Sequence, residues 1–158
     1  MTENELREIV KRTLASFKTD KTRMTLSLAE KICDAVMAYA EKMGVKAVVC
    51  ISDEAGNPRL VKSMDDAYIA SYDVAVNKAF TVVALKMSTK KLSTLAQPGQ
   101  SLYGIQFTNG GRIVIFGGGE PLYGEDGKII GGLGVSGGSE AEDTEVARQG
   151  REFFEKMK

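Results

Sequence analysis

The sequence predicts an α+β domain built on five strands, and three observations lead to this fold class. The segments with strand character fall into two groups, each joined by short turns. The helical segments stand in separate blocks and do not alternate with strands, as a Rossmann or TIM arrangement would need. The chain has 158 residues, of which 43% are hydrophobic and 27% charged, a length and composition typical of one globular domain.

Composition excludes several classes of function. Lys plus Arg and Asp plus Glu both number 21, so the chain lacks the basic surplus of a protein that binds nucleic acid or a membrane surface. The chain contains no His, which excludes Ser-His-Asp catalysis, Cys-His catalysis and metal sites built on imidazole. Two cysteines cannot form a four-cysteine zinc site, and we expect Cys33 and Cys50 to be buried structural thiols. With no signal peptide and no long apolar run, the sequence is typical of a soluble cytoplasmic protein.

An amphipathic helix is predicted at the N-terminus, over residues 2–17. Thr2 and Glu5 have the spacing of a capping box. The following polar stretch predicts a link, so we divide the chain into an N-terminal helix and linker, 1–22, and a main domain, 23–158. The apolar face either packs on the main domain or contacts another subunit, and the sequence leaves both possibilities open. This face consists of Leu6, Ile9, Val10, Leu14 and Phe17.

The first half of the main domain reads as a helix followed by a hairpin. The helix is expected to begin near Ser27, with Glu30 completing a capping box, and to end at Gly44. A strand is predicted over residues 46–53, and because its run 47–51 is apolar on both faces, we expect it to be central and covered. A turn then returns the chain as a partner strand over 59–64. The apolar stripe of the helix is Leu28, Ile32, Val36, Tyr39 and Met43.

The second half contains two helices, three short strands and a final helix. The helices are predicted over 68–86 and 89–96, and the first carries Tyr72, Val76, Ala79, Phe80 and Val83 on one face. Strands are predicted over 112–116, 120–123 and 128–135, with Asp126-Gly127 forming a hairpin turn between the last two. Ser139 and Glu142 cap the final helix, whose inner face is expected to carry Val146, Phe153 and Met157.

Two glycine-rich segments, 116–120 and 134–139, are the first candidates for a binding site. Neither matches a Walker loop or a dinucleotide fingerprint. Four acidic residues at the start of the final helix would repel a phosphate there: Glu140, Glu142, Asp143 and Glu145. Tight turns with close backbone packing are the favoured interpretation, and a neutral or partly apolar ligand remains open.

Residues 24–150 resemble the GlcG/HbpS-type family, which also occurs as the C-terminal domain of PduO-type corrinoid adenosyltransferases. Many short segments carry the resemblance in the order typical of the family. They are Leu26–Lys31, Ser52–Gly56, Met64–Ala67, Asn77–Thr81, Gln97–Gly99, Leu102–Ile105, Gly110–Gly119, Pro121-Leu122 and Ile130–Gly138.

The resemblance implies a profilin-like fold, in which α/β/α layers surround a five-stranded antiparallel sheet. It also implies a homo-oligomer, and members of the family bind haem, degrade it, or serve diol, glycolate or microcompartment pathways. The adenosyltransferase activity belongs to the other domain of PduO-type proteins and is not expected here. PduO-type domains are thought to use a His for haem iron. This His-free chain would need Met, Tyr, Cys or Lys as the iron ligand instead, or would bind haem at its surface through the propionates.

The leading functional hypothesis is therefore a small-molecule binding module, with haem or a related tetrapyrrole as its ligand and no catalytic residues assigned. Lys78 would meet an anionic group and glycine-rich backbone would line the ligand. One alternative is an oligomeric interaction or accessory protein of a diol- or glycolate-type or microcompartment pathway. Another is a haem-degrading enzyme that uses Tyr, Lys or a carboxylate for proton transfer. The candidate ligand-binding residues are Asp65, Lys78, Tyr103, Gly117, Gly118, Gly119, Ser136, Gly137 and Gly138.

Overall fold

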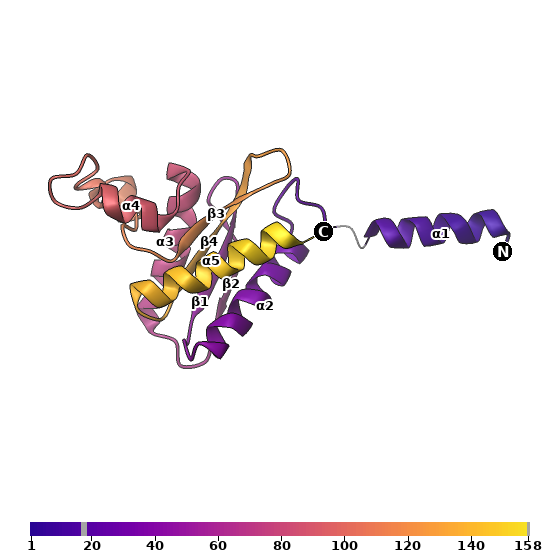
Figure 1. Cartoon of the computed structure of the whole chain (residues 1–158), viewed down its shortest axis with the longest axis horizontal. Helices are drawn as coiled ribbons and strands as arrows, with labels where there is room; N and C mark the ends of the chain where they lie inside the picture. Colours follow the sequence, from indigo (N-terminus) through magenta and orange to yellow (C-terminus); the bar gives the residue numbers. More distant parts are fainter. Residues whose placement is uncertain (17–18, 158) are drawn as a thin grey trace.

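The computed structural model describes residues 1–16 and 19–157, and it has the α+β organisation expected from the sequence (Figure 1). The order of helices and strands matches the predicted order except for one strand. In chain order the described elements are α1 Glu3–Ser16, α2 Leu26–Lys42, β1 Val48–Asp53, β2 Pro58–Ser63, α3 Ile69–Leu85, α4 Thr89–Leu95, the short 3-10 turns Ile105–Phe107 and Asn109–Gly111, β3 Gly119–Tyr123, β4 Ile129–Ser136 and α5 Glu140–Lys156.

The described strands form one antiparallel sheet in the order β2-β1-β4-β3. As predicted, β1 is central and buried. The Asp53 N–H donates to the Asn57 carbonyl at 2.8 Å, which closes the β1–β2 turn. The Gly124 N–H donates to the Lys128 carbonyl, also at 2.8 Å, so the Asp-Gly hairpin between β3 and β4 is confirmed.

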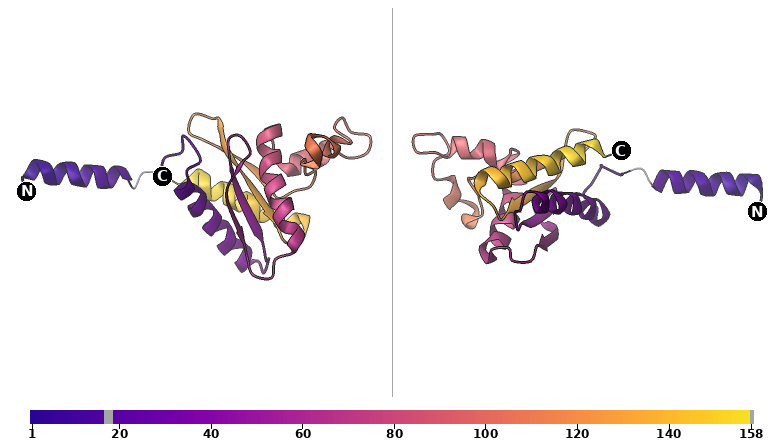
Figure 2. Two further views of the ribbon diagram at one scale, coloured as in Figure 1. Left: turned by 180° about the vertical axis from the view of Figure 1, so that it is seen from behind. Right: turned by 60° about the horizontal axis from the view of Figure 1, so that its bottom comes forward.

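Helices cover both faces of this sheet. Helices α2 and α5 pack together on one face, and α3 lies on the other (Figure 2). The larger apolar core lies between the sheet and the α2–α5 pair, and it contains Ile32, Val36, Leu133 and Phe154. The chain is therefore a three-layer α/β/α structure.

The prediction of a fifth strand over Arg112–Phe116 is wrong, because this segment finds its hydrogen bonds on α3. The Val114 N–H donates to the Thr81 hydroxyl at 3.0 Å, and the same hydroxyl lies 3.3 Å from the Arg112 carbonyl. Ile113 is buried, which explains the strand-like apolar pattern. A helix side chain thus satisfies backbone groups that a neighbouring strand would otherwise pair.

The sequence also misplaced the start of α2. The cap is Thr25, whose hydroxyl accepts the Leu28 N–H at 3.1 Å, so Ser27 lies inside the helix and forms no capping box with Glu30. The end of the helix at Gly44 is confirmed, since this residue takes the positive φ typical of a helix terminus.

The buried faces of α3 and α5 differ from the predicted ones by about one residue. In α3 the predicted Ala79 is buried, but Tyr72 is 55% exposed and Ala75 faces the sheet in its place. In α5 the predicted Val146 is buried and Met157 packs against the core, but Phe154 is buried where Phe153 was expected. The predicted capping box of Ser139 and Glu142 is confirmed. Apolar residues adjoin one another on both helices, so spacing alone did not select the buried member.

Helix α1 stands clear of the three layers (Figures 1 and 2). Its capping box is confirmed, because the Thr2 N–H donates to the Glu5 carboxylate at 2.6 Å and the Glu5 N–H to the Thr2 hydroxyl at 3.3 Å. Leu6, Ile9 and Val10 are between 47% and 51% exposed. Phe17 and the side chain of Leu14, also predicted on this face, lie outside the described residues.

Glycines on β4 set the distance between the sheet and α3. A Cβ atom at Gly134 would lie 2.0 Å from the Ala75 carbonyl oxygen, and one at Gly132 would lie 2.3 Å from that of Ala79. Real Cβ atoms do not approach backbone so closely, so any side chain there would push the helix away. The glycine-rich sequence of β4 is therefore a packing requirement.

We expect Gly134→Ala to lower the free energy of unfolding by about 2–3 kcal/mol, because the added methyl group meets helix backbone that cannot move alone. Urea denaturation measures this. Gly99→Asn is the matched control, since a Cβ at Gly99 meets nothing within 4 Å and Asn tolerates its positive φ. The control should change stability by less than about 1 kcal/mol. Equal effects of the two substitutions would contradict the close-packing explanation.

Candidate functional site

The two glycine-rich segments meet at the Lys78 side chain, which is 0% exposed. Its ammonium donates to the Val135 carbonyl at 2.7 Å and to the Asp143 carboxylate at 3.0 Å. Lys78 belongs to α3 and Asp143 to α5, so the pair links the two helical layers around the end of the sheet. A Cβ at Gly118 would lie 2.5 Å from the Lys78 nitrogen, so glycine leaves the room that the ammonium occupies.

Burial opposes charge on both members of this pair. It lowers the pKa of Lys78 and raises the pKa of Asp143, because each charged form loses hydration, while their mutual attraction acts against both shifts. The second Asp143 oxygen accepts the Gly138 N–H at 2.8 Å. The Phe116 ring lies 5.1 Å from the Lys78 nitrogen, a distance that permits a cation–π contact. Lys78 and Asp143 are thus each supplied with partners from within the chain.

The structure brings some of the candidate ligand-binding residues together and separates others. Lys78, the glycines 117–119 and the segment 136–138 lie around the buried pair, and the Ser136 hydroxyl bonds to that of Ser71 at 3.1 Å. Asp65 instead lines a surface hollow beside α2, and Tyr103 is exposed in the loop after α4. A ligand contact of Lys78 stays a prediction; what the geometry assigns to Lys78 is an internal carboxylate partner.

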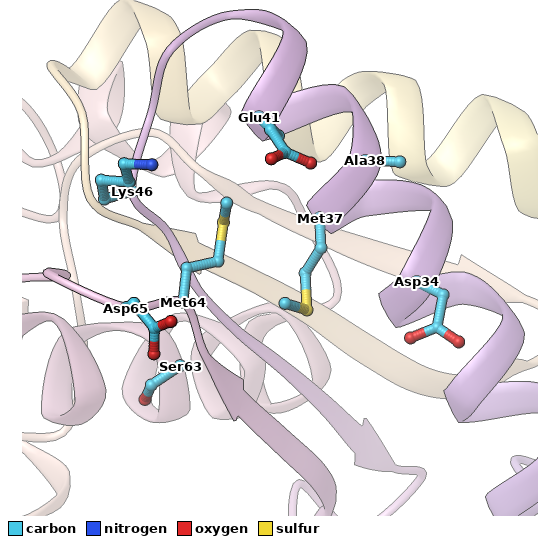
Figure 3. Close-up of a pocket in the computed structure, with 8 residues that line it drawn as sticks. All are labelled: Asp34, Met37, Ala38, Glu41, Lys46, Ser63, Met64 and Asp65. Atoms are coloured by element: carbon cyan, nitrogen blue, oxygen red, sulfur yellow. The ribbon is translucent and has the colours of Figure 1, made fainter.

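One surface hollow, here called the helix hollow, lies between α2 and the end of β2 and has a volume of about 520 Å³. Figure 3 shows Met37 and Met64 reaching into it from its two walls. Its charged groups are mainly carboxylates, so it disfavours an anionic ligand. The lining residues are Asp34, Met37, Ala38, Glu41, Lys46, Ser63, Met64 and Asp65.

A second hollow, here called the hairpin hollow, lies where the end of α3 meets the β3–β4 turn and has a volume of about 530 Å³. Both hollows fall within the size range of small-molecule sites. The hairpin hollow combines two lysines, one phenol and aliphatic side chains, and it contains a single carboxylate. The lining residues are Glu54, Val83, Lys86, Tyr123, Gly127, Lys128 and Ile129.

Cysteine is not available as an iron ligand in the described structure. Cys33 and Cys50 are buried and free, as the sequence indicated, and burial raises the pKa of their thiols to about 11 and about 12. Only the thiolate ligates metals well. Among residues 1–16 and 19–157, no cluster of three or more carboxylates or cysteines is arranged to hold a metal ion.

Sequence reasoning missed the partner of Lys78 and the cations of the hairpin hollow. In the sequence, Asp143 is one of four acidic residues at the start of the final helix, and nothing there indicates that it faces Lys78. Tyr123 and Lys128 flank the Asp-Gly turn, so the hairpin itself indicated that they lie near each other. Lys86 carried no such signal, because only the packing of α3 across the sheet brings its C-terminal end to this turn.

The fold defines a class: a small three-layer α/β/α domain with helices on both faces of an antiparallel sheet. No described helix is long and apolar enough to cross a membrane. Residues 24–152 match the model of a family described as "Haem degrading protein HbpS-like". The chain belongs to this HbpS-like family, which confirms the resemblance inferred from the sequence.

Individual relatives agree with this assignment. The chain is 42% identical over 134 residues to an uncharacterised 15.0 kDa protein from the dhaT–dhaS intergenic region of Citrobacter freundii, covering 85% of this chain and 94% of that one. It is 38% identical over 149 residues to the corrinoid adenosyltransferase PduO of the same organism, covering 91% of this chain but only 44% of PduO. A solved PduOC:Heme complex superposes with a TM-score of 0.79 at 37% identity, covering 83% of this chain and 94% of that one.

We expect Lys78→Met to lower the free energy of unfolding by about 3 kcal/mol, because it leaves the buried Asp143 carboxylate without its counter-charge. Asp143→Asn should cost a similar amount, and the double variant should cost less than the two single effects added together. Denaturant unfolding of the four proteins provides the double-mutant cycle.

The control is the exposed pair of Lys62 and Asp34, whose nitrogen and oxygen lie 2.5 Å apart. Lys62→Met should cost less than about 1 kcal/mol, because exposed ion pairs contribute little. If the Lys78 and Asp143 effects simply add, the two residues are not coupled and the buried pair does not join the layers.

Proposed function

We propose that this protein binds haem or a closely related tetrapyrrole in the hairpin hollow. Two findings support the proposal from outside the site: the family is named for haem degradation, and a relative with the same fold is solved as a haem complex. The observation that carries it within this chain is the presence of a phenol, two ammonium groups and aliphatic walls in one hollow.

The donor set of this hollow fits haem despite the absence of His. Tyrosine is an established ligand of haem iron, and Tyr123 presents a half-exposed phenol. Lys86 and Lys128 would meet the propionates, while Val83 and Ile129 would contact the apolar macrocycle. Bound haem would supply an iron centre for redox chemistry; the residues named here bind and orient it.

The helix hollow fits haem less well, although two methionines line it. Its carboxylates Asp34, Glu41 and Asp65 outnumber the ammonium of Lys46, so propionates would be repelled. The sulfur of Met64 already accepts the Ala47 N–H at 3.3 Å. The charge balance therefore favours the hairpin hollow as the tetrapyrrole site.

A haemin titration followed by absorbance tests the proposal. The wild-type protein should give a saturable spectral change with one haem per chain. Tyr123→Phe should abolish the spectral signature of phenolate ligation and weaken binding at least tenfold, because the iron loses its ligand. Lys86→Glu combined with Lys128→Glu should weaken binding by a similar factor, since the propionates then face negative charge.

Tyr103→Phe is the matched control, because it removes an exposed phenol from a different loop. It should leave the titration unchanged. A loss of binding with Tyr103→Phe but not with Tyr123→Phe would place the ligand elsewhere, and a non-saturating response of the wild type would reject haem. Repeating the titration with ascorbate separates binding from breakdown, since breakdown bleaches the haem absorbance.

A further inference from the structure

We propose that α1 is a self-association helix, which packs antiparallel against α1 of a second copy of this chain. The inference is independent of the haem proposal. It concerns residues that precede the segment 24–152 matched by the family model, and it uses no residue of either hollow.

The first observation is the uncovered apolar stripe of α1. Leu6, Ile9 and Val10 follow the three- and four-residue spacing of one helix face, yet each remains about half exposed. The helix has 14 residues, a length at which an isolated helix is only marginally stable in water. Covering this stripe with a second apolar surface would supply the missing stabilisation.

The second observation is the division of charge along α1. The acidic residues Glu3, Glu5 and Glu8 fall in the first half, whereas Lys11 and Arg12 fall in the second. Arg7, between them, pairs with Glu3 at 2.9 Å within the same helix. The two halves of α1 therefore carry opposite charge.

The opposite charges of the two halves of α1 favour a second α1 as the partner and an antiparallel orientation of the two helices. In an antiparallel pair, the acidic half of one helix lies beside the basic half of the other, and the helix dipoles also oppose favourably. A parallel pair would place like charges side by side. Because α1 contains both an acidic and a basic half, a second, identical α1 can pair each half with one of opposite charge. Such a contact has two-fold symmetry.

The contact is small, and this predicts how the association behaves. Two such helices bury less than the roughly 1,200 Å² of a standard stable interface. We therefore expect association that rises with protein concentration. Pairing through α1 should double the molar mass of whatever assembly the α/β/α domain forms by itself.

The first test compares full-length variants by sedimentation equilibrium over a range of concentrations. Ile9→Glu places a charge in the stripe and should remove the concentration-dependent doubling of mass seen for the wild type. Asn4→Glu is the matched control, because it adds the same charge away from the stripe and should leave the doubling intact. Circular dichroism of each variant reports whether α1 remains helical.

The second test uses charge. A chain with Glu3, Glu5 and Glu8 changed to Lys, and another with Arg7, Lys11 and Arg12 changed to Glu, should each fail to associate alone but associate when mixed. A third chain carries Glu5→Lys, Glu8→Lys, Lys11→Glu and Arg12→Glu, which exchanges the charges of the two halves. Against wild type, this chain should not pair if the helices are antiparallel.

Three results would overturn the inference. Retention of the mass doubling in Ile9→Glu would show that α1 is not the contact. Association of wild type with the exchanged-charge chain would show that the helices pair in parallel. A wild type more compact than Ile9→Glu, with no difference in mass, would show that α1 packs on its own domain.

Discussion

Helix α3 lies so close to β4 that no side chain fits between their backbones at Gly132 and Gly134. The rest of the arrangement depends on this contact. It places α3 centrally over the sheet, brings the Lys78 side chain to the end of β4, and brings the C-terminal end of α3 to the β3–β4 turn. It also explains why α3 presents alanines to the sheet and leaves Tyr72 exposed. Because the helix carries Thr81, the same contact determines where segment 112–116 finds its hydrogen bonds.

The buried pair of Lys78 and Asp143 is the second organising feature, and it is electrostatic. An ammonium and a carboxylate withdrawn from water contribute little net stability compared with apolar packing, but each becomes costly without the other. The pair therefore favours the one arrangement in which α3 and α5 are correctly placed on opposite faces of the sheet. The glycine-rich segments that resemble anion-binding loops in the sequence surround this pair, and the Gly138 N–H is already bonded to Asp143.

The features that suit binding lie away from this core. Both hollows are at the margins of the layers, where helix ends and turns meet, and their charges differ in sign. Helix α1, whose apolar residues Leu6, Ile9 and Val10 are about half exposed, is further removed still (Figure 1). Substitutions in the proposed haem site or on the proposed self-association face would therefore leave the packing of α3 on β4 undisturbed.

The sequence by itself determined the features that depend on neighbours along the chain. These are the α+β class, the covered strand β1, the two hairpins, the capping boxes of α1 and α5, and the family resemblance carried by many short motifs. Tertiary structure alone decided that segment 112–116 is not a strand, which side of α3 is buried, and that Lys78 meets Asp143 65 residues later in the chain. It also decided that Lys86 joins Tyr123 and Lys128 in one hollow. The physical reason is that caps and turns form their hydrogen bonds within a few residues of the chain. The tertiary pairings instead depend on how closely α3 approaches β4, and this distance is set by glycines of β4 that lie far from α3 in the sequence.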